Sequence, residues 1–416
     1  MNSADNRRRQ LRARRGIASG MLVLGLGVML GLIAITINVS RLRQVHTQLR
    51  SACEAAALAG AAELLDESQL YGTSDQQGDT LAARLQAQTI AAQHAIDGQP
   101  LSLDLNLDNA PAGDIQVGCV THPELLQQPF VPAAQSKAPC NAIVVNGSRH
   151  QARGNPVAMW LGGLFGVPTA NVSCEARAVI DRRIVGFRPK GLTAVPIMPC
   201  LLDAQAWLAQ RAQQPTQYTD RFTINQYTNE VVQGGDGIVE LEFRCPIGGG
   251  TSTVTTTNGN YLAGPWALLP AGDNQTDYAT IERQCSGGLT ANDLADYGGE
   301  LVVPWGNPLA VEALRRADPN FGDTLWTILG QRRVWALCST GANSENSTDS
   351  TATGGLSRWS ILDFTAGAVV DAWVDRSVQP NQLVIFVQPT LLATSTAVTD
   401  SQATENNSIA KLQLSQ

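Results

Sequence analysis

The feature that most constrains this chain is an uncharged stretch near its beginning, residues 16–39, which reads GIASGMLVLGLGVMLGLIAITINV. As an α-helix its 24 residues would be about 36 Å long, enough to cross a hydrocarbon core of roughly 30 Å. The helices of a soluble core rarely stay uncharged for so long. We therefore interpret residues 16–39 as a transmembrane helix, with Gly16 and Met21 among the residues that pack in the membrane.

The charge before this stretch predicts its orientation. Residues 1–15 contain six arginines and one acid, a net charge of +5, whereas the whole chain carries −7 and residues 16–416 therefore −12. Because positive segments stay on the cytoplasmic side, we expect the N-terminus inside and everything beyond residue 40 outside. A bacterial inner (cytoplasmic) membrane location follows, with the C-terminal part periplasmic or extracytoplasmic and no nucleic-acid partner. A cleaved signal peptide is the alternative, but the apolar run is too long and lacks a good cleavage site.

The helical pattern continues beyond the apolar stretch. SRLRQVHTQLRSACEAAALAGAAELL places apolar or small residues three or four positions apart, so one helix of about 70 Å is expected over residues 17–65. Its upper part presents Ala52, Ala56, Ala59 and Gly60, a narrow face of small residues that lets another backbone approach closely. That neighbour is either a second protein or the chain's own β-rich domain, and the sequence leaves both open.

Several motifs follow one another in the order typical of a known family. They are Arg14-Arg15-Gly16, the apolar helix, NVSR at residues 38–41 and CEAAALAGA at residues 53–61. With these the chain resembles the TadE/TadG-like proteins of the tight-adherence (Flp) pilus assembly system, in their TadG-like N-terminal region. Weaker similarity lies at residues 155–167 (NPVAMWLGGLFGV), 171–176 (NVSCEA) and 383–389.

The resemblance implies a structural role. It suggests a membrane-anchored component of pilus assembly that contacts other pilus-assembly or pilin-like proteins, without catalysis or cofactor. Prepilin-like members are cut after a glycine and carry a glutamate five residues later. Here Met21 stands at that position after Gly16, so we expect an uncut anchor.

The expected fold class is α+β, with a transmembrane helix that continues into a long helix and then a β-rich extracytoplasmic region. Alternating or continuous apolar residues predict strands at residues 101–108, 172–180, 239–245 and 383–387, and residues 156–167 predict a short helix. The expected divisions are a basic segment 1–15, the membrane helix 16–39, a helical stalk 40–97, a small α/β TadG-like module 98–185, a β-rich domain 186–395 and a disordered tail 396–416. Residues 248–260 and 339–355 are small and polar, typical of loops.

All eight cysteines lie beyond the anchor, where an oxidising compartment favours disulfides. We predict at least two, without assigning pairs, although a local pair of Cys119 with Cys140 is plausible and Cys53 could be free. The disulfide candidates are Cys119, Cys140, Cys174, Cys200, Cys245, Cys285 and Cys338.

No pattern predicts an active site or a metal site. Cys119, His122, Cys140 and His150 match no common zinc spacing, and Asp293, Asp296 and Glu300 are interpreted as solvated acids. The second half is rich in tryptophan. We expect these side chains to pack in the core, since that is more usual than a face that binds carbohydrate. These tryptophans are Trp305, Trp326, Trp335, Trp359 and Trp373. Such a face would support the alternative function, a membrane-tethered adhesin or glycan-binding surface protein active in cell adhesion.

Overall fold

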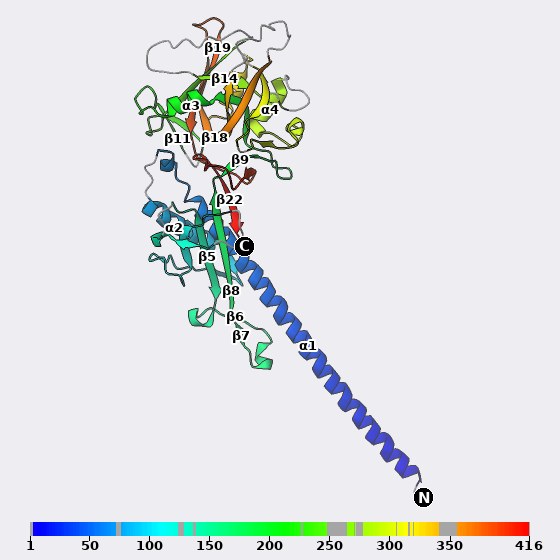
Figure 1. Ribbon diagram of the computed structural model, residues 1–416. Coiled ribbons are helices and arrows are strands. Elements are labelled where there is room, and N and C mark those ends of the chain that lie inside the picture. Colours follow the sequence, from blue (N-terminus) through cyan, green and yellow to red (C-terminus); the bar gives the residue numbers. More distant parts are fainter. Residues whose placement is uncertain are drawn as a thin grey trace.

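One helix, α1 (Ser3–Ala62), projects as a rod at one end and is built into a folded body at the other (Figure 1). The computed structural model describes residues 3–71, 76–123, 129–135, 139–225, 228–247, 264–269, 271, 278–304, 306–314, 317–318, 320–340 and 356–415, and only the backbone of residues 3–20. An apolar helix followed by a β-rich body confirms the predicted α+β class. The polar loops expected at residues 248–260 and 339–355 lie outside the described residues, except for 339–340.

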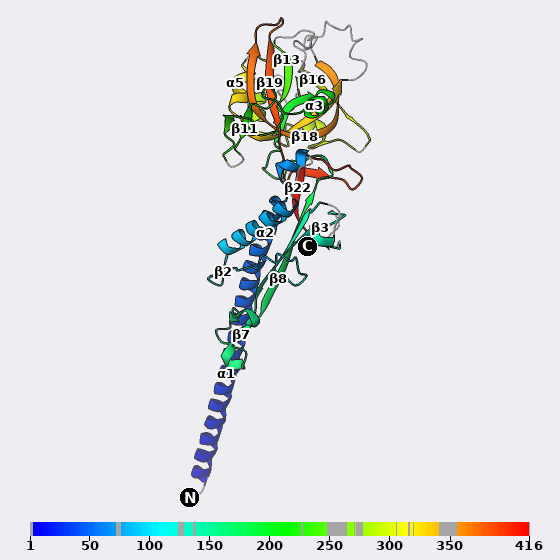
Figure 2. The same ribbon diagram turned by 90° about the vertical axis from the view of Figure 1, so that its left-hand side faces the viewer.

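The helical part folds back on itself. After α1 the chain makes a 3₁₀ turn, η1 (Glu67–Tyr71), and then forms α2 (Gln76–Gln93), which packs along the upper part of α1 (Figure 2). Alanines 83, 87 and 91 of α2 are fully buried, so small residues face small residues between the two helices. The predicted long helix is confirmed, although it begins at Ser3 rather than near residue 17 and ends at Ala62 rather than near residue 65.

A six-stranded sheet lies against these helices. Its strand order is β20-β22-β8-β5-β3-β4, antiparallel except for the β20–β22 pair. The strands are β3 (Ile115–Cys119), β4 (Val131–Pro132), β5 (Ala142–Arg149), β8 (Val172–Asp181), β20 (Leu392–Ala393) and β22 (Ile409–Ser415). Helix α1 packs on β5, β8 and β22, and α2 on β3, with an apolar core between helices and sheet. We call α2, this sheet and the part of α1 packed on it the proximal module.

The chain's last strand corrects one expectation. The described part of the expected disordered tail, residues 396–415, is ordered instead, because β21 (Ala397–Thr399) and β22 are both paired strands. Strand β22 lies beside β8, with Leu412 opposite Ile180 and Leu414 opposite Ala178. The polar composition hid a short alternation, Leu412-Gln413-Leu414, that suits a half-buried strand. The C-terminal end of the chain thereby completes a sheet that begins almost 300 residues earlier.

Two predicted elements take other forms. Residues 101–108 are not a strand, because side chains of α2 occupy their carbonyls: Gln88 Nε2 donates to Leu103 O (2.8 Å) and Arg84 Nη1 to Leu105 O (3.0 Å). Residues 156–167 are not a helix. They belong to a hairpin of β6 (Val157–Ala158) and β7 (Thr169–Ala170), which flanks the 3₁₀ turn η4 (Gly162–Phe165) and is closed by Gly166 in the left-handed region. Glycine and proline in this segment disfavour a continuous helix.

The remaining large sheet forms a distal module. Its order is β10-β17-β18-β16-β14-β13-β19, and additional β10–β14 and β18–β19 pairings close it on itself. These strands are β10 (Ile197–Asp203), β13 (Leu241–Pro246), β14 (Gly264–Leu268), β16 (Leu309–Leu314), β17 (Arg332–Thr340), β18 (Leu356–Asp375) and β19 (Gln382–Pro389). Neighbouring residues of β17 alternate between two apolar cores: Trp335 enters one, Val334 and Ala336 the other. The strands predicted at residues 172–180, 239–245 and 383–387 are confirmed as β8, β13 and β19.

Short elements complete the described chain. A small three-stranded sheet has the order β15-β9-β21, and its strand β9 directly follows β8 in the sequence. Three helices pack on the distal strands. These elements are β9 (Ile184–Phe187), β15 (Leu301–Val302), α3 (Ala204–Arg211), α4 (Tyr278–Gly287), α5 (Phe321–Trp326), η2 (Ala133–Gln135), η3 (Gln151–Arg153) and η5 (Ala295–Tyr297), with the two-stranded pairs β1 (Ala95–Ile96) with β2 (Gln99–Pro100) and β11 (Phe222–Ile224) with β12 (Val231–Gln233).

Candidate functional site

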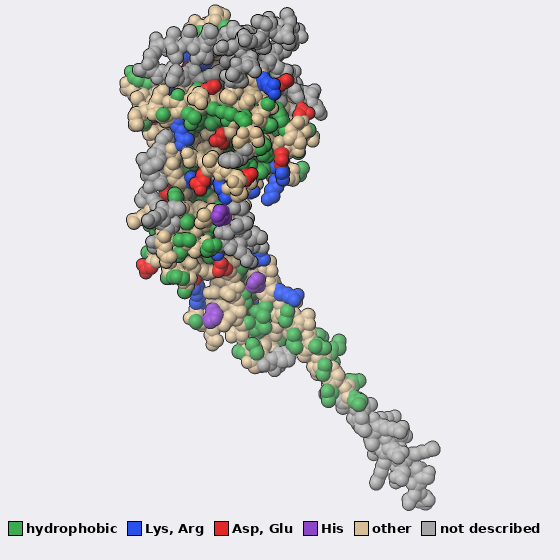
Figure 3. Space-filling model, in the orientation of Figure 1, with side chains coloured by type: hydrophobic (Ala, Val, Ile, Leu, Met, Phe, Trp, Pro, Cys, Tyr) green, Lys and Arg blue, Asp and Glu red, His purple; other side chains and the backbone are tan. Residues whose placement is uncertain are grey.

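The lower half of α1 is an exposed apolar surface. Large hydrophobic side chains face outward from Met21 to Val39, except along the face of Ala34 and Asn38, and Figure 3 shows hydrophobic side chains along the rod that leaves the body. Within the described residues one helix, Met21–Ala62, is long and apolar enough to cross a membrane by length and composition, with a most apolar 18-residue window of mean hydropathy 2.4. Exposing so many apolar side chains to water would be very unfavourable, whereas lipid would accommodate them. Gly16 lies in the part of α1 described by its backbone alone.

The upper half of the same helix is buried in the proximal module. Ala52 and Ala56 are fully buried, Gly60 is buried and Ala59 is half-buried at the edge. A Cβ built on Gly60 would lie 2.6 Å from Ile143 Cδ1 of β5 and 2.8 Å from Ala83 O of α2. The small-residue face therefore packs against the chain's own sheet and helix, which decides between the two neighbours left open by the sequence.

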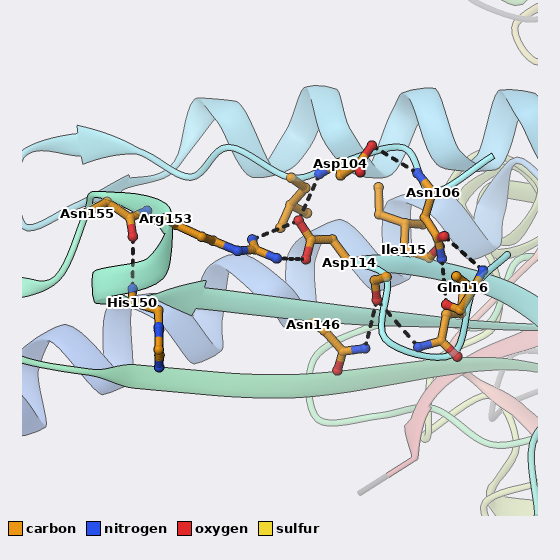
Figure 4. A network of polar contacts seen from close by, with 12 residues as sticks. Asp104, Asn106, Asp114, Ile115, Gln116, Asn146, His150, Arg153 and Asn155 are labelled. Atoms are coloured by element: carbon orange, nitrogen blue, oxygen red, sulfur yellow. Dashed lines mark hydrogen bonds and ion pairs between the residues drawn. The ribbon is translucent and has the colours of Figure 1, made fainter. Parts of the chain in front are cut away.

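An ion pair between the buried Asp114 and the exposed Arg153 fixes the loop of residues 104–116. Asp114, 3% exposed, accepts hydrogen bonds from Arg153 Nη1 (2.9 Å) and from the backbone N–H of Asp104 (2.8 Å), and Arg153 Nη2 makes a second bond to it (Figure 4). Asn106 Nδ2 donates to Ile115 O (2.8 Å) and to the carbonyl of Ala110 (3.0 Å). These contacts replace the missing strand pairing of residues 101–108, and the network is structural.

The cysteines correct another expectation. The eight cysteines all belong to the described residues and form no disulfide there, so the predicted bridges are not supported. Instead, three of them pack in one apolar core as small hydrophobic side chains: Cys200, Cys245 and Cys285. Burial raises the pKa of the Cys200 and Cys285 thiols, which keeps them protonated and unreactive.

The disulfide candidates of the proximal module are placed differently. Cys174 of β8 is half-buried, and its carbonyl accepts a bond from Cys53 Sγ of α1 (3.8 Å). Burial raises the pKa of Cys53 to about 12. Cys119 and Cys140 both line a cavity of 210 Å³ beside Arg182 and Asp181. Cys338, in the distal module, is buried on β17 and its thiol donates to Ala336 O (3.7 Å).

The carboxylates have unequal surroundings. Asp296 is exposed and Glu300 pairs with Arg188, but Asp293 is buried, so the prediction of a solvated acid is wrong for it. Burial opposes ionisation of Asp293, yet hydrogen bonds from Arg283, Thr290 and Gln284 outweigh it and lower its pKa to about 2. A carboxylate held ionised by its own loop stabilises that loop. In the part of the chain that the structure describes, no group of three or more His, Cys, Asp or Glu could hold a metal ion.

The tryptophans divide between core and surface. Trp335 and Trp359 are fully buried, whereas Trp326 is 57% exposed and Trp373 stacks on Phe386 with ring centres 4.9 Å apart. Trp305 lies outside the described residues. The prediction of core packing is therefore right for Trp335 and Trp359. Trp326 and Trp373 are instead partly exposed to solvent.

Comparison with protein families identifies the proximal part of the chain. A family described as Flp pilus-assembly TadE/G-like matches residues 16–63, and a second, Tad-like Flp pilus-assembly family (Tad_C) matches residues 59–178. Residues 16–178 are therefore similar to Tad-like pilus-assembly families, and we call them the Tad-like region. The predicted resemblance is thus confirmed, and its two matches meet where α1 ends. No curated protein and no solved structure matched the chain.

The Tad-like region covers most of the proximal module, except for β20, β22 and the end of β8. It contains α1 from residue 16, α2, β3, β5 and most of β8, whereas the distal module lies beyond these two matches. The Tad pilus-assembly families are structural. Sequence reasoning missed the roles of Arg84 and Gln88 in this region, and it missed β22, which joins the same sheet from residues 409–415. Only the alternation in β22 left a local signal that could have been found.

Proposed function

We propose that this protein is a membrane-anchored, TadG-like structural component of Flp/Tad pilus assembly that acts through protein–protein contact in the envelope. The observation that carries the proposal is the division of α1: residues 21–39 expose an apolar surface, and residues 45–61 are built into the Tad-like fold. The helix is continuous across this division. A shift of its membrane part would therefore move the folded body with it. Catalysis plays no part in this role.

The proposed location is the bacterial inner membrane, with the N-terminus in the cytoplasm. The arginines of residues 1–15 and the net charge of −12 beyond them support this orientation under the positive-inside rule. The partners are other pilus-assembly or pilin-like proteins. They would meet the distal module, which α1 and the proximal module hold away from the bilayer (Figure 2).

Deleting the gene and restoring it with variants tests the proposal. We expect deletion to abolish surface pili and the unaltered gene to restore them. Leu26→Arg should fail to restore pili and should leave the membrane fraction, since an arginine at mid-span costs about 2.5–3.5 kcal/mol. Gln44→Arg, on an exposed position of the same helix above the membrane, is the matched control and should restore pili.

Other outcomes separate the alternatives. Normal piliation of the deletion strain would refute a role in assembly. Pili that remain while attachment is lost would favour the adhesin, whose binding face would have to use the exposed Trp326 and Trp373. A membrane-stable Leu26→Arg protein would refute the assignment of residues 16–39 as the anchor.

A further inference from the structure

The β6–β7 hairpin, residues 157–170, lies beside the part of α1 that we assign to the membrane (Figure 2). The backbone N–H of Leu161 donates to Asn38 Oδ1 of α1 (3.3 Å). Asn38 is 5% exposed and Ala34, one turn lower, 2%, although the neighbouring large side chains of α1 face outward. Ala34 lies five residues before the end of the predicted span, about 7.5 Å along the helix. The hairpin therefore reaches below the expected surface of the bilayer.

The hairpin has the composition of a membrane-inserted loop. The chain carries no charged residue between Arg153 and Glu175, a stretch that contains the whole hairpin. Trp160 and Val167 are 72% and 53% exposed, so the tip presents large apolar side chains outward. Because these side chains share one uncharged tip and that tip lies next to the apolar surface of α1, they extend the surface that we assign to the membrane.

The backbone of the hairpin suits an apolar surrounding as well. Met159 N–H donates to Pro168 O (2.9 Å), and the N–H groups of Val167 and Gly162 donate to Gly162 O (2.9 Å) and Met159 O (3.1 Å). A Cβ on Gly162 would lie 2.0 Å from Val167 O, so the glycine permits this tight closure. These bonds pair part of the hairpin backbone internally, which lowers the cost of placing it at the apolar boundary of the bilayer.

Trp160 marks the depth of the hairpin. The Arg41 guanidinium lies 4.5 Å from the centre of the Trp160 ring and also pairs with Asp97 (2.9 Å). Arg41 is the first charged residue after the apolar run, so this contact fixes Trp160 at the level where the helix leaves the bilayer. Tryptophan is enriched at that level, and arginine extends its head group toward the lipid phosphates there.

We propose that the β6–β7 hairpin is a second membrane-contacting element, which inserts its apolar tip into the outer leaflet of the bilayer beside α1. Two contacts fix a helix in rotation and tilt, which one contact cannot do, so the hairpin sets the direction in which the body stands on the membrane. The inference rests on the proposed membrane anchoring. A lipid surface is the favoured occupant of the tip because the tip is uncharged and continuous with the apolar surface of α1.

Depth-dependent quenching of Trp160 tests this proposal. The full chain is reconstituted in phosphatidylcholine vesicles, and the Trp160 emission is obtained as the difference between wild type and Trp160→Phe. Lipids brominated near the headgroup end of their chains should quench this emission about twofold, as expected for a residue at the interface. Aqueous acrylamide should quench it little.

Trp326 supplies the matched control. It is similarly exposed but lies on α5 of the distal module, far along the chain from the anchor. Its emission, obtained with Trp326→Phe, should respond to acrylamide and not to brominated lipid. If Trp160 behaves like Trp326, the hairpin lies in water and the inference is wrong.

Three combined outcomes also overturn the inference. Protection of Trp160 from both quenchers would mean that a second copy of the chain covers the tip. Release of the chain from the vesicles by alkaline carbonate would refute the anchor and the hairpin together. A chain that resists carbonate while Trp160 escapes lipid quenching would refute the hairpin alone and leave the anchor intact.

Discussion

Replacing Gly60 by alanine should loosen the proximal module, although alanine favours a helix. In a helix interior, alanine is about 1 kcal/mol better than glycine. At this position, however, the added Cβ would lie 2.6 Å from Ile143 Cδ1, 2.8 Å from Ala83 O and 3.1 Å from Ala87 Cβ. The methyl group of Ile143 can turn away, but the carbonyl of Ala83 belongs to the backbone of α2. The two helices must therefore separate.

The expected size follows from these opposing effects. Overpacking a well-filled core costs about 1–3 kcal/mol, and we take the upper part of this range because the contact involves backbone. After the gain in helix propensity, a net loss of about 1–2 kcal/mol remains. Gly60→Leu adds three more carbons to the same space and should cost more than Gly60→Ala.

Hydrogen exchange of the full chain in detergent micelles measures this loss locally. Amides of α2 and β5 should exchange about 5 to 30 times faster in Gly60→Ala, since 1.36 kcal/mol corresponds to a tenfold change. Gly287→Ala is the matched control, because a Cβ at the end of α4 meets nothing within 4 Å. Its exchange should be unchanged or slower.

Unchanged protection of α2 and β5 in Gly60→Ala would refute the reasoning. It would mean that the small-residue face has room to spare in this chain. The face would then be better explained as a docking surface for another protein, and Ala59→Leu and Gly60→Leu should weaken capture of that protein instead.

Three further predictions concern single groups. Asp293→Asn should lose about 1–2 kcal/mol of stability at neutral pH. Because the native pKa of Asp293 is about 2, the stability difference from the wild type should be nearly complete above pH ~4 and vanish as the pH falls toward 2. Unfolding of both proteins along an acid titration would show this. Asp114→Ala should remove the acceptor of the Asp104 N–H and of Arg153 and cost about 1–3 kcal/mol, measurable by denaturant unfolding, whereas Asp114→Asn should cost less. Brief maleimide treatment of the native protein should modify the half-buried Cys174 well before the buried Cys285, and labelling in the reverse order would contradict the described packing.

Part of this protein could be predicted because its signals are local. The uncharged run of residues 16–39, the 3–4 spacing that follows it and the alternation in β8 each act through neighbours in sequence. The Tad-like resemblance was found for the same reason, since its motifs lie within one continuous helix.

Residues 101–108 show how a local signal can mislead. Their alternation is that of a strand, and Leu101 and Leu103 do point into the core. No neighbouring strand in the described part of the chain pairs with these residues. The side chains of Arg84 and Gln88 donate to their carbonyl groups instead. Hydrophobic periodicity reports which side chains are buried, not which groups satisfy the backbone.

The sequence by itself determined that an apolar helix leads into a small-residue helix and then a β-rich body. Only the tertiary structure decided what covers the small residues, that β22 returns to pair with β8, and that the β6–β7 hairpin lies beside the anchor. The physical reason is that these contacts join segments that are distant in the sequence, such as Gly60 with Ile143, Leu412 with Ile180 and Asn38 with Leu161. Such pairings depend on the shape of the assembled core, which no local pattern contains.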